Sequence, residues 1–345
     1  MIEVDRIKYL NSNDIQSGGF VIYWMQASQR VSFNHALIYG IEQANRYNQP
    51  LVVFFGFTPN FPEANVRHYL FMLEGLKQTQ KQLKDLGIQL VIQPESPEIG
   101  IINMAKYASL VIVDRGYLRI QRHWRNEVAQ RIKCPLIQVE SDVIVPIEIA
   151  SQKEEFSAAT FRPKIMKYFQ LYLQKPSLPE VIKQSLKIEF SVVDISDLNQ
   201  FFAESDINMD VKSVSSFHGG TSVAEKHLEA FIKDKLDLYT NRNDPSNNIV
   251  SNMSPYLHFG QISPLYIALR IMHTGSPATE DYLEELIVRR ELSMNYVYYN
   301  QNYDKYTGLP EWAQATLHDH RIDKRPYLYS LEELELAETH DPYWN

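Results

Sequence analysis

The sequence predicts two parts: an α/β amino-terminal domain built on a doubly wound parallel sheet, and a mainly α-helical domain after it. Two observations lead to this prediction. Short apolar, β-branched runs alternate with helical segments up to about residue 145, and from Ser222 onward only helical periodicity remains. The length agrees, because 345 residues at roughly 100 to 200 per domain correspond to about two domains.

Five strands are expected in the first part. Their apolar runs recur at even intervals and are Phe20–Met25, Leu51–Phe57, Leu90–Gln93, Leu110–Asp114 and Leu136–Val139. Between the second and third runs, Glu63–Leu86 places Tyr69, Leu76 and Leu83 on one face, as in an amphipathic helix packed on a sheet. Strand, helix and strand at this spacing favour parallel pairing with right-handed crossovers, the arrangement of a Rossmann-like fold.

The turn after the first strand, Gln26-Ala27-Ser28-Gln29, lacks the glycines of a dinucleotide fingerprint, so it offers no phosphate cradle of that type. A ligand of this domain would therefore bind at the carboxyl ends of the strands, between Tyr23–Gln26 and Asp114–Arg119. The same aromatic residues would serve equally well as sheet core. The sequence leaves both interpretations open.

We place the α/β domain at residues 1–150, a proline-interrupted connector at 151–198, and the helical part at 199–345. Ser263 is a suitable N-cap for one helix of the last part, with Pro264 at its first helical position. Four amphipathic helices are predicted there: Val223–Tyr239, Ser263–Met272, Asp281–Tyr299 and Leu309–His318.

With a net charge of −8, the protein cannot bind nucleic acid through an overall positive charge. The excess acid lies in residues 217–345, which hold 11 basic and 19 acidic side chains, so binding of any polyanion would need a local basic patch.

The one cysteine, Cys134, excludes an internal disulfide framework, and the histidines show no metal-ligand spacing. Without a signal peptide or an apolar stretch of about 18 residues, we expect a cytoplasmic protein with no membrane partner and no metal.

Hydroxyl and amide side chains cluster in residues 247–264, just ahead of a short helical stretch. Exposed backbone N–H groups and the positive end of a helix dipole would make this an anion site, and a pyrophosphate would suit it. The alternative is two successive Ser-Pro helix starts with their caps.

The segment 281–296 puts Tyr282, Glu285, Arg289 and Leu292 on one helical face. A carboxylate next to an arginine stays ionised and can accept a hydrogen bond from the N–H of a base or imide. An ordinary exposed Glu–Arg pair is the alternative. Nine of the 21 tyrosines lie between Tyr282 and Tyr343, which suits base stacking, flavin packing or an ordinary core.

The run Ser251-Asn252-Met253-Ser254-Pro255-Tyr256-Leu257-His258-Phe259-Gly260-Gln261-Ile262, with Arg242-Asn243-Asp244-Pro245 ahead of it, resembles the flavin-binding signature of class II cyclobutane pyrimidine dimer photolyases. Further similar stretches follow in the family's order along nearly the whole chain. They include Val21–Met25, Arg67–Leu76, Thr160–Lys164, Glu284–Asn295, Pro310–Ala313 and Arg325–Ser330. His218-Gly219-Gly220 departs from the family, which usually has a Pro-Gly-Glu type of turn there.

The resemblance implies a monomeric, light-driven repair enzyme in which reduced FAD gives an electron to a pyrimidine dimer flipped out of UV-damaged DNA. It assigns FAD binding to Tyr239, Arg242, Val250, Ser251, Asn252, Met253 and Ser254. Glu285 would hydrogen-bond the pyrimidine edge, with Glu284 as the alternate, and Tyr282 and Arg289 would line the same pocket. The amino-terminal domain would be of the antenna type, with a chromophore that the sequence does not identify.

The family normally continues for roughly a hundred residues beyond the position of Asn345, and that region supplies the other wall of the FAD pocket. The sequence is therefore expected to be a truncated or split form of the enzyme. Two alternatives stay open at this stage: a non-catalytic homologue that binds DNA or nucleotide without repair, and a light-signalling cryptochrome.

Overall fold

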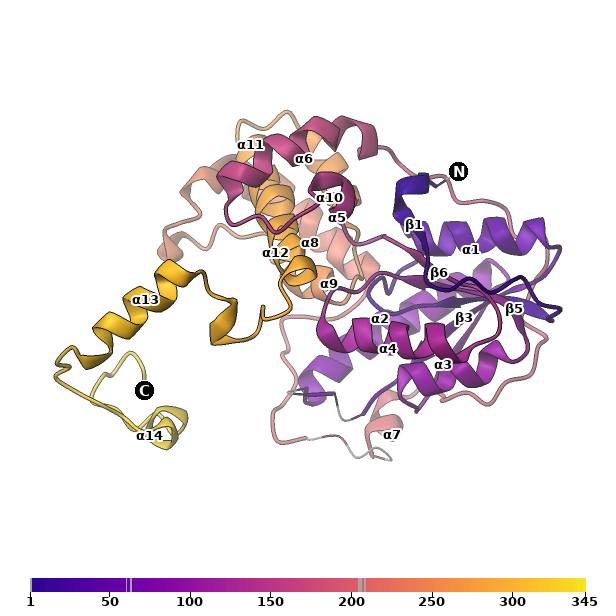
Figure 1. Cartoon of the computed structure of the whole chain (residues 1–345), viewed down its shortest axis with the longest axis horizontal. Coiled ribbons are helices and arrows are strands. Elements are labelled where there is room, and N and C mark those ends of the chain that lie inside the picture. Colours follow the sequence, from indigo (N-terminus) through magenta and orange to yellow (C-terminus); the bar gives the residue numbers. More distant parts are fainter. Residues whose placement is uncertain (1, 60, 63, 204–206, 208) are drawn as a thin grey trace. The chain divides into compact units, whose positions relative to one another are not determined.

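The computed structural model describes residues 2–59, 61–62, 64–203, 207 and 209–345, with only the backbone of residues 199 and 203. The chain divides into two compact units, Met1–Tyr299 and Asn300–Asn345, which are described separately. The first unit holds both the sheet and the helices that carry most of the predicted site residues (Figure 1).

A six-stranded sheet forms the centre of the first part of this unit (Figure 1). Its order is β1-β6-β5-β2-β3-β4, with β1 antiparallel to β6 and every other pair parallel. The strands are β1 (Ile7–Tyr9), β2 (Phe20–Trp24), β3 (Leu51–Gly56), β4 (Gln89–Gln93), β5 (Ala108–Asp114) and β6 (Leu136–Val139). The sheet reverses its winding between β2 and β5, which makes the carboxyl ends of these two strands the natural ligand position.

Two pairs of helices cover the two faces of the sheet. Along β2, Val21 and Tyr23 pack toward α1 (His35–Arg46) and α2 (Val66–Asp85). The alternate residues Ile22 and Trp24 pack toward α3 (Pro97–Ala105) and α4 (Arg119–Arg131). Because both faces are covered, the central strands are apolar throughout rather than alternating.

The predicted α/β fold with a helical remainder is confirmed, and the five predicted strands are all present. The edge strand β1 was not predicted, because it has only three residues, Ile-Lys-Tyr, of which the last two are exposed, and so it is too short to show periodicity. The helix expected from Glu63 runs as α2 from Val66, and Glu63 itself lies outside the described residues.

The short helix α5 (Ile147–Ala150) ends the predicted α/β domain, and the connector then forms α6 (Ala158–Tyr172) and returns along the open edge of β4. Ser185 N–H donates to the carbonyl of Gly87 (2.9 Å), and Val193 N–H donates to that of Ile92 (2.8 Å). This segment therefore covers a sheet edge that would otherwise be free to pair with another chain. The helix α7 (Leu198–Ala203) follows, and the boundaries at residues 150 and 198 stay predictions.

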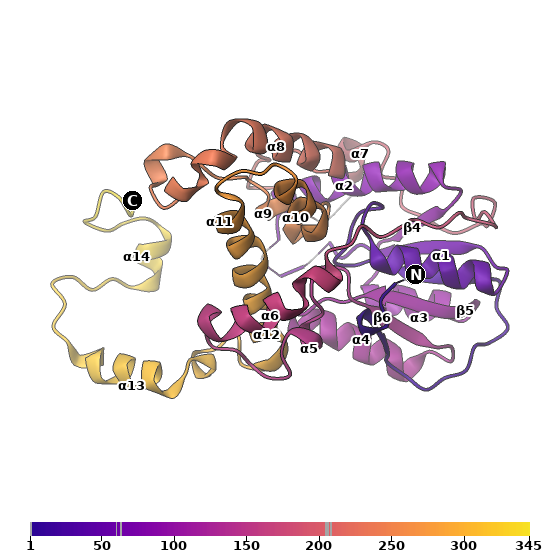
Figure 2. The same cartoon turned by 90° about the horizontal axis from the view of Figure 1, so that it is seen from above.

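A helical layer completes the first unit, and Figure 2 shows it beside the sheet. Its α-helices are α8 (Thr221–Asp234), α9 (Ser254–His258), α10 (Pro264–Met272), α11 (Thr279–Leu283) and α12 (Arg290–Tyr299). Shorter turns are η1 (Val4–Arg6) near the amino terminus, η2 (Leu236–Asn241), η3 (Pro245–Asn247) and η4 (Glu284–Arg289), the last of which is π-helical. Ser263 is the N-cap of α10 as predicted, but its side chain makes no capping hydrogen bond.

The helical layer meets the sheet domain through close backbone contacts. Gly260 has a φ of +63°, and a Cβ at this position would lie 1.8 Å from the carbonyl oxygen of Ala27. Gly219, in the turn that departs from the family pattern, would place a Cβ 1.9 Å from the carbonyl oxygen of Phe71. Both glycines therefore allow an approach that any side chain would block.

Helix α12 is anchored to the segment that follows β6. Arg290 donates to the carbonyl of Asp142 (2.7 Å), and its guanidinium lies 3.0 Å from the Asp142 carboxylate. The Glu291 carboxylate is fully buried and accepts hydrogen bonds from the N–H groups of Ile144 (2.6 Å) and Val145 (3.3 Å). Burial raises the pKa of Glu291 to about 8, although these N–H groups and the Arg290 charge act in the opposite direction.

This raised pKa predicts that stability falls as pH rises. The folded protein holds the Glu291 proton more tightly than the unfolded chain does, so this stabilisation is complete below the ordinary pKa of 4.5 and is lost as pH rises to about 8. The slope should approach about −1.4 kcal/mol per pH unit. Urea unfolding from pH 5 to 8 should show less loss in Glu291→Gln than in the wild type. Parallel curves for the two proteins would contradict the prediction.

The second unit contains η5 (Tyr306–Gly308), α13 (Glu311–Asp319), η6 (His320–Ile322) and α14 (Leu331–Glu335). A capping box starts α14, in which Ser330 Oγ accepts from the N–H of Glu333 and the Glu333 carboxylate accepts from that of Ser330. Among the residues of this second unit, 300–345, only Gly308 is buried. The predicted helix Leu309–His318 corresponds to α13.

In the part of the chain that the structure describes, no helix is both long enough and apolar enough to cross a membrane. The same residues contain no cluster of three or more His, Cys, Asp or Glu side chains placed to hold a metal ion.

Candidate functional site

The predicted catalytic residues lie on one long helix that is not a regular α-helix. It comprises α11, η4 and α12, and at the end of η4 the N–H of Arg290 donates to the carbonyl of Glu285, five residues earlier. In such a π turn, residues five apart share a face, whereas in an α-helix they lie about 140° apart. The wide turn therefore changes which side chains can meet.

Tyr239 and Tyr282 pack together although 43 positions separate them in the chain. Their ring centroids are 5.0 Å apart, and Phe231 lies 5.2 Å from the Tyr282 ring. The Tyr282 hydroxyl donates to Ser251 Oγ at 3.0 Å, and burial raises the pKa of this phenol, so it stays protonated. The cluster thus joins η2, α11 and the loop before α9.

Arg242 lies at the edge of this aromatic cluster. Its guanidinium carbon is 4.9 Å from the centroid of the Tyr239 ring, a cation–π arrangement. Arg242 Nη2 donates to Glu285 Oε1 at 2.9 Å, and Asp281 lies 3.7 Å away. The hydrogen bond to Glu285 raises the pKa of Arg242. A partly exposed cation is therefore held between two carboxylates on the long helix.

The loop before α9 carries the remaining predicted cofactor-binding residues. Asn252 has a φ of +57°, a left-handed conformation that asparagine tolerates better than most residues. Met253 is buried in the helical core, Val250 is 44% exposed, and Ser254 begins α9 with its side chain exposed. Met253 thus anchors the loop in the core, while the residues on either side of it remain partly accessible.

Glu284 belongs to a different cluster from Glu285. Arg162 of α6 binds it with two hydrogen bonds, Nε to Oε2 at 2.9 Å and Nη2 to Oε1 at 2.6 Å. Arg289 Nε adds a third at 3.1 Å to Oε1. These arginines hold the pKa of Glu284 below its ordinary value, with the Arg162 hydrogen bond as the main cause.

The structure therefore brings together five of the predicted residues, which we call the Arg242 cluster: Tyr239, Arg242, Ser251, Tyr282 and Glu285. Regular helical spacing predicts Arg289 on the face of Tyr282 and Glu285, but Arg289 pairs with Glu284 because of the π turn. Sequence reasoning missed Asp281 and Arg162. The spacing of Asp281, four residues before Glu285, could have indicated it, whereas Arg162 is too distant in sequence to leave a local signal.

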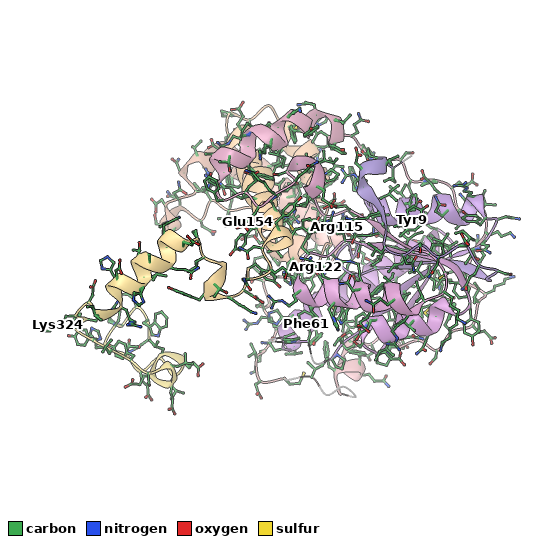
Figure 3. The ribbon with its side chains drawn as sticks, in the orientation of Figure 1. Tyr9, Phe61, Arg115, Arg122, Glu154 and Lys324 are labelled. Atoms are coloured by element: carbon green, nitrogen blue, oxygen red, sulfur yellow. The ribbon has the colours of Figure 1, made fainter. Side chains whose placement is uncertain are left out.

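A cavity of about 770 Å³ lies at the carboxyl ends of β2, β3 and β5, and the predicted cofactor-binding residue Ser254 is part of its wall. We call it the strand-end pocket. Its walls include Phe61, Tyr69 and Trp124, and α9 and α12 contribute Ser254, His258 and Arg290. Phe61 is labelled in Figure 3, as are Arg115 and Arg122, whose guanidinium carbons lie 4.4 and 5.5 Å from the ring centroid of Tyr298 of α12.

A protein carboxylate occupies the anion position between β2 and β5. Asp114 accepts hydrogen bonds from the N–H groups of Gln26 (3.0 Å), Ala27 (3.2 Å) and Ser28 (2.7 Å), and from the Tyr23 hydroxyl (3.0 Å). The turn that lacks a glycine fingerprint therefore uses its amides internally. The strand-end pocket lies beside this turn, in part within the segments that the sequence indicated as a ligand position.

Comparison with known proteins agrees with this geometry. Residues 21–181 match the family model described as DNA photolyase. A deoxyribodipyrimidine photo-lyase of Methanothermobacter thermautotrophicus is 48% identical over 347 residues, which cover 100% of this chain and 76% of that protein. The chain belongs to the DNA photolyase family.

Solved structures of photolyase-like proteins share the fold. A cryptochrome of Synechocystis sp. superposes with a TM-score of 0.66 at 17% identity, over 82% of this chain and 62% of that one. A photolyase of Sulfolobus tokodaii, solved with two FAD molecules, superposes with a TM-score of 0.64 at 16% identity, over 87% of this chain and 66% of that one. This photolyase homologue thus spans about three quarters of its M. thermautotrophicus relative and less than two thirds of the solved chains.

Proposed function

We propose that this chain carries out light-dependent repair of cyclobutane pyrimidine dimers in DNA, as a class II deoxyribodipyrimidine photo-lyase. The observation that carries the proposal is the Arg242 cluster, because it gathers cofactor-binding and substrate-binding candidates from three distant segments at one place. The name of the relative that is 48% identical supports the reaction. The run from Ser251 to Ile262 supports the assignment to class II.

The donor set of the cluster fits FAD. Arg242 supplies a cation for a pyrophosphate, and Ser251 and Asn252 supply a hydroxyl and an amide. Tyr239 and Met253 support these groups from the buried side, while Val250 and Ser254 stay accessible at the loop surface. When bound in its reduced form, FAD supplies a light-driven electron transfer that splits the cyclobutane ring and recovers the electron.

We propose Glu285, rather than Glu284, as the acceptor for the pyrimidine edge of the dimer. Glu284 already accepts three hydrogen bonds from arginines, whereas Glu285 accepts from Arg242 through Oε1. The Glu285 side chain is also more exposed, 41% against 22% for Glu284. Tyr282 would hold the helix against the cofactor side, and Arg289, 56% exposed, would lie at the rim of the pocket.

The strand-end pocket is the proposed place for an antenna chromophore. Its volume lies in the usual range of roughly 300 to 1,000 Å³ for small-molecule sites, and its aromatic walls suit a flat ring system. Gln26 borders the pocket, and neither polar atom of its buried carboxamide has a hydrogen-bond partner among the described residues.

The proposed partner is UV-damaged DNA, bound by a monomer of 40.2 kDa. Because the chain is acidic overall, contact with phosphates would depend on local cations such as Arg289, which is 56% exposed on the long helix. Gel filtration tests whether the protein is a monomer, and the salt dependence of DNA binding tests the phosphate contacts.

Replacing Arg242 with Ala should weaken retention of FAD about 10- to 100-fold, because a charge-assisted hydrogen bond contributes roughly 1.5–3 kcal/mol. Flavin absorbance after reconstitution and gel filtration measures this. The matched control is Arg270→Ala, which removes another partly exposed arginine paired with a glutamate, Glu229, outside the cluster. Wild-type protein that retains no flavin would refute the proposed cofactor, and equal retention by both variants would refute the role of Arg242.

A further inference from the structure

We propose that Arg162 is a positioning residue for Glu285, acting through Glu284 and the π turn. The inference rests on the proposed function, in which Glu285 accepts hydrogen bonds from the pyrimidine dimer. Arg162 itself belongs to α6 in the connector, and both of its side-chain hydrogen bonds within the described residues go to Glu284.

The geometry of the ion pairs depends on the wide turn. Glu284 and Arg289 are five residues apart and are joined at 3.1 Å, a pairing that a regular α-helix disfavours because positions five apart point about 140° away from each other. The π turn covers the same residues, Glu284–Arg289. The ion pair and the wide turn therefore support each other.

Arg162 fixes this arrangement from outside the helix. Its guanidinium binds the Glu284 carboxylate through both oxygens, the fork geometry that fixes orientation as well as distance. Arg162 is also anchored from behind, since its neighbour Phe161 is fully buried in the helical core. The clamp thus ties the first residue of the π turn to a second, separately packed helix.

Glu285 follows Glu284 directly, so the clamp determines where its carboxylate points. With Glu284 held toward α6, Glu285 lies on the next face of the helix and meets Arg242 at 2.9 Å. If the clamp is removed, the turn can relax toward regular α-helical spacing, and every side chain after it rotates relative to those before it. Arg162 therefore selects which of two adjacent glutamates is presented to the substrate.

The test compares Arg162→Gln with Arg270→Gln. Both remove a bidentate arginine–glutamate pair with similar exposure of the arginine, 45% for Arg162 and 43% for Arg270, so their effects on unfolding should be alike. We expect Arg162→Gln to raise KM for dimer-containing DNA about 3- to 10-fold, with kcat and FAD content within twofold of the wild type. The preference for dimer-containing over undamaged DNA in the dark should fall by the same factor.

Two further variants separate positioning from general damage. Arg162→Lys keeps the charge but not the fork, so it should recover only part of the preference. The double variant Arg162→Gln/Glu284→Gln should be no worse than Arg162→Gln, because both changes remove one clamp. Wild-type preference in Arg162→Gln, or an equal loss in Arg270→Gln, would overturn the inference alone. Absence of any dimer preference in the wild type would overturn the proposed function and the inference with it.

Discussion

Replacing Arg30 with Met should destabilise the protein by about 3–5 kcal/mol, the largest loss of stability that we expect from a single side chain. The guanidinium is completely buried and donates to three carbonyls, those of Gly260 (2.9 Å), Ser141 (3.0 Å) and Phe33 (3.2 Å). Methionine fills much of the volume but leaves these oxygens buried without a donor, at roughly 1–3 kcal/mol for each one left unsatisfied.

Urea unfolding measures the effect of Arg30→Met. The control is Arg67→Met, which removes an exposed arginine that donates to the carbonyl of Lys212 and should cost less than about 0.5 kcal/mol. Because one of the Arg30 bonds reaches Gly260, near the end of the run Ser251–Ile262 in the helical layer, the loss should affect the sheet and the helical layer together. A two-step transition with an unchanged sheet signal would contradict this coupling.

Replacing Glu285 with Gln should lower kcat/KM for dimer repair about 10- to 100-fold. A hydrogen bond to a charged group contributes roughly 1.5–3 kcal/mol, and each 1.36 kcal/mol is a factor of ten in rate. FAD retention should not fall, because removing the Glu285 charge leaves Arg242 freer to bind a pyrophosphate.

Repair kinetics with an oligonucleotide that carries one dimer measure the effect of Glu285→Gln. The control is Glu280→Gln, which makes the same charge change at an exposed position in the first turn of α11. Repair by Glu285→Gln at the wild-type rate, or an equal loss in Glu280→Gln, would show that the dimer does not depend on this carboxylate.

The fold was largely predictable because its signals are local. The five apolar runs that become parallel strands are long enough to show their pattern, and α2 and α10 have clear amphipathic spacing. The strand β1 gave no signal, since it has only three residues, two of them exposed, and depends on pairing with β6.

The candidate site was predictable in composition but not in arrangement. A regular period of 3.6 residues groups Tyr282, Glu285 and Arg289, and the π turn separates Arg289 from the other two. The clamp from Arg162 spans 122 positions, and such a contact leaves no trace in local periodicity. The same holds for the bond between Tyr282 and Ser251, because the family resemblance assigned Ser251 to FAD binding and Tyr282 to the dimer pocket.

Light-dependent repair tests the central claim most directly. The purified chain is reconstituted with FAD, reduced, and mixed with oligothymidylate that contains cyclobutane dimers, and recovery of the thymine ultraviolet absorbance is followed in the dark and under blue light. We expect recovery that requires both light and bound flavin and that Glu285→Gln slows. Flavin-loaded protein that binds dimer-containing DNA equally in dark and light, with no recovery of thymine, would contradict the account and identify a binding protein without repair activity.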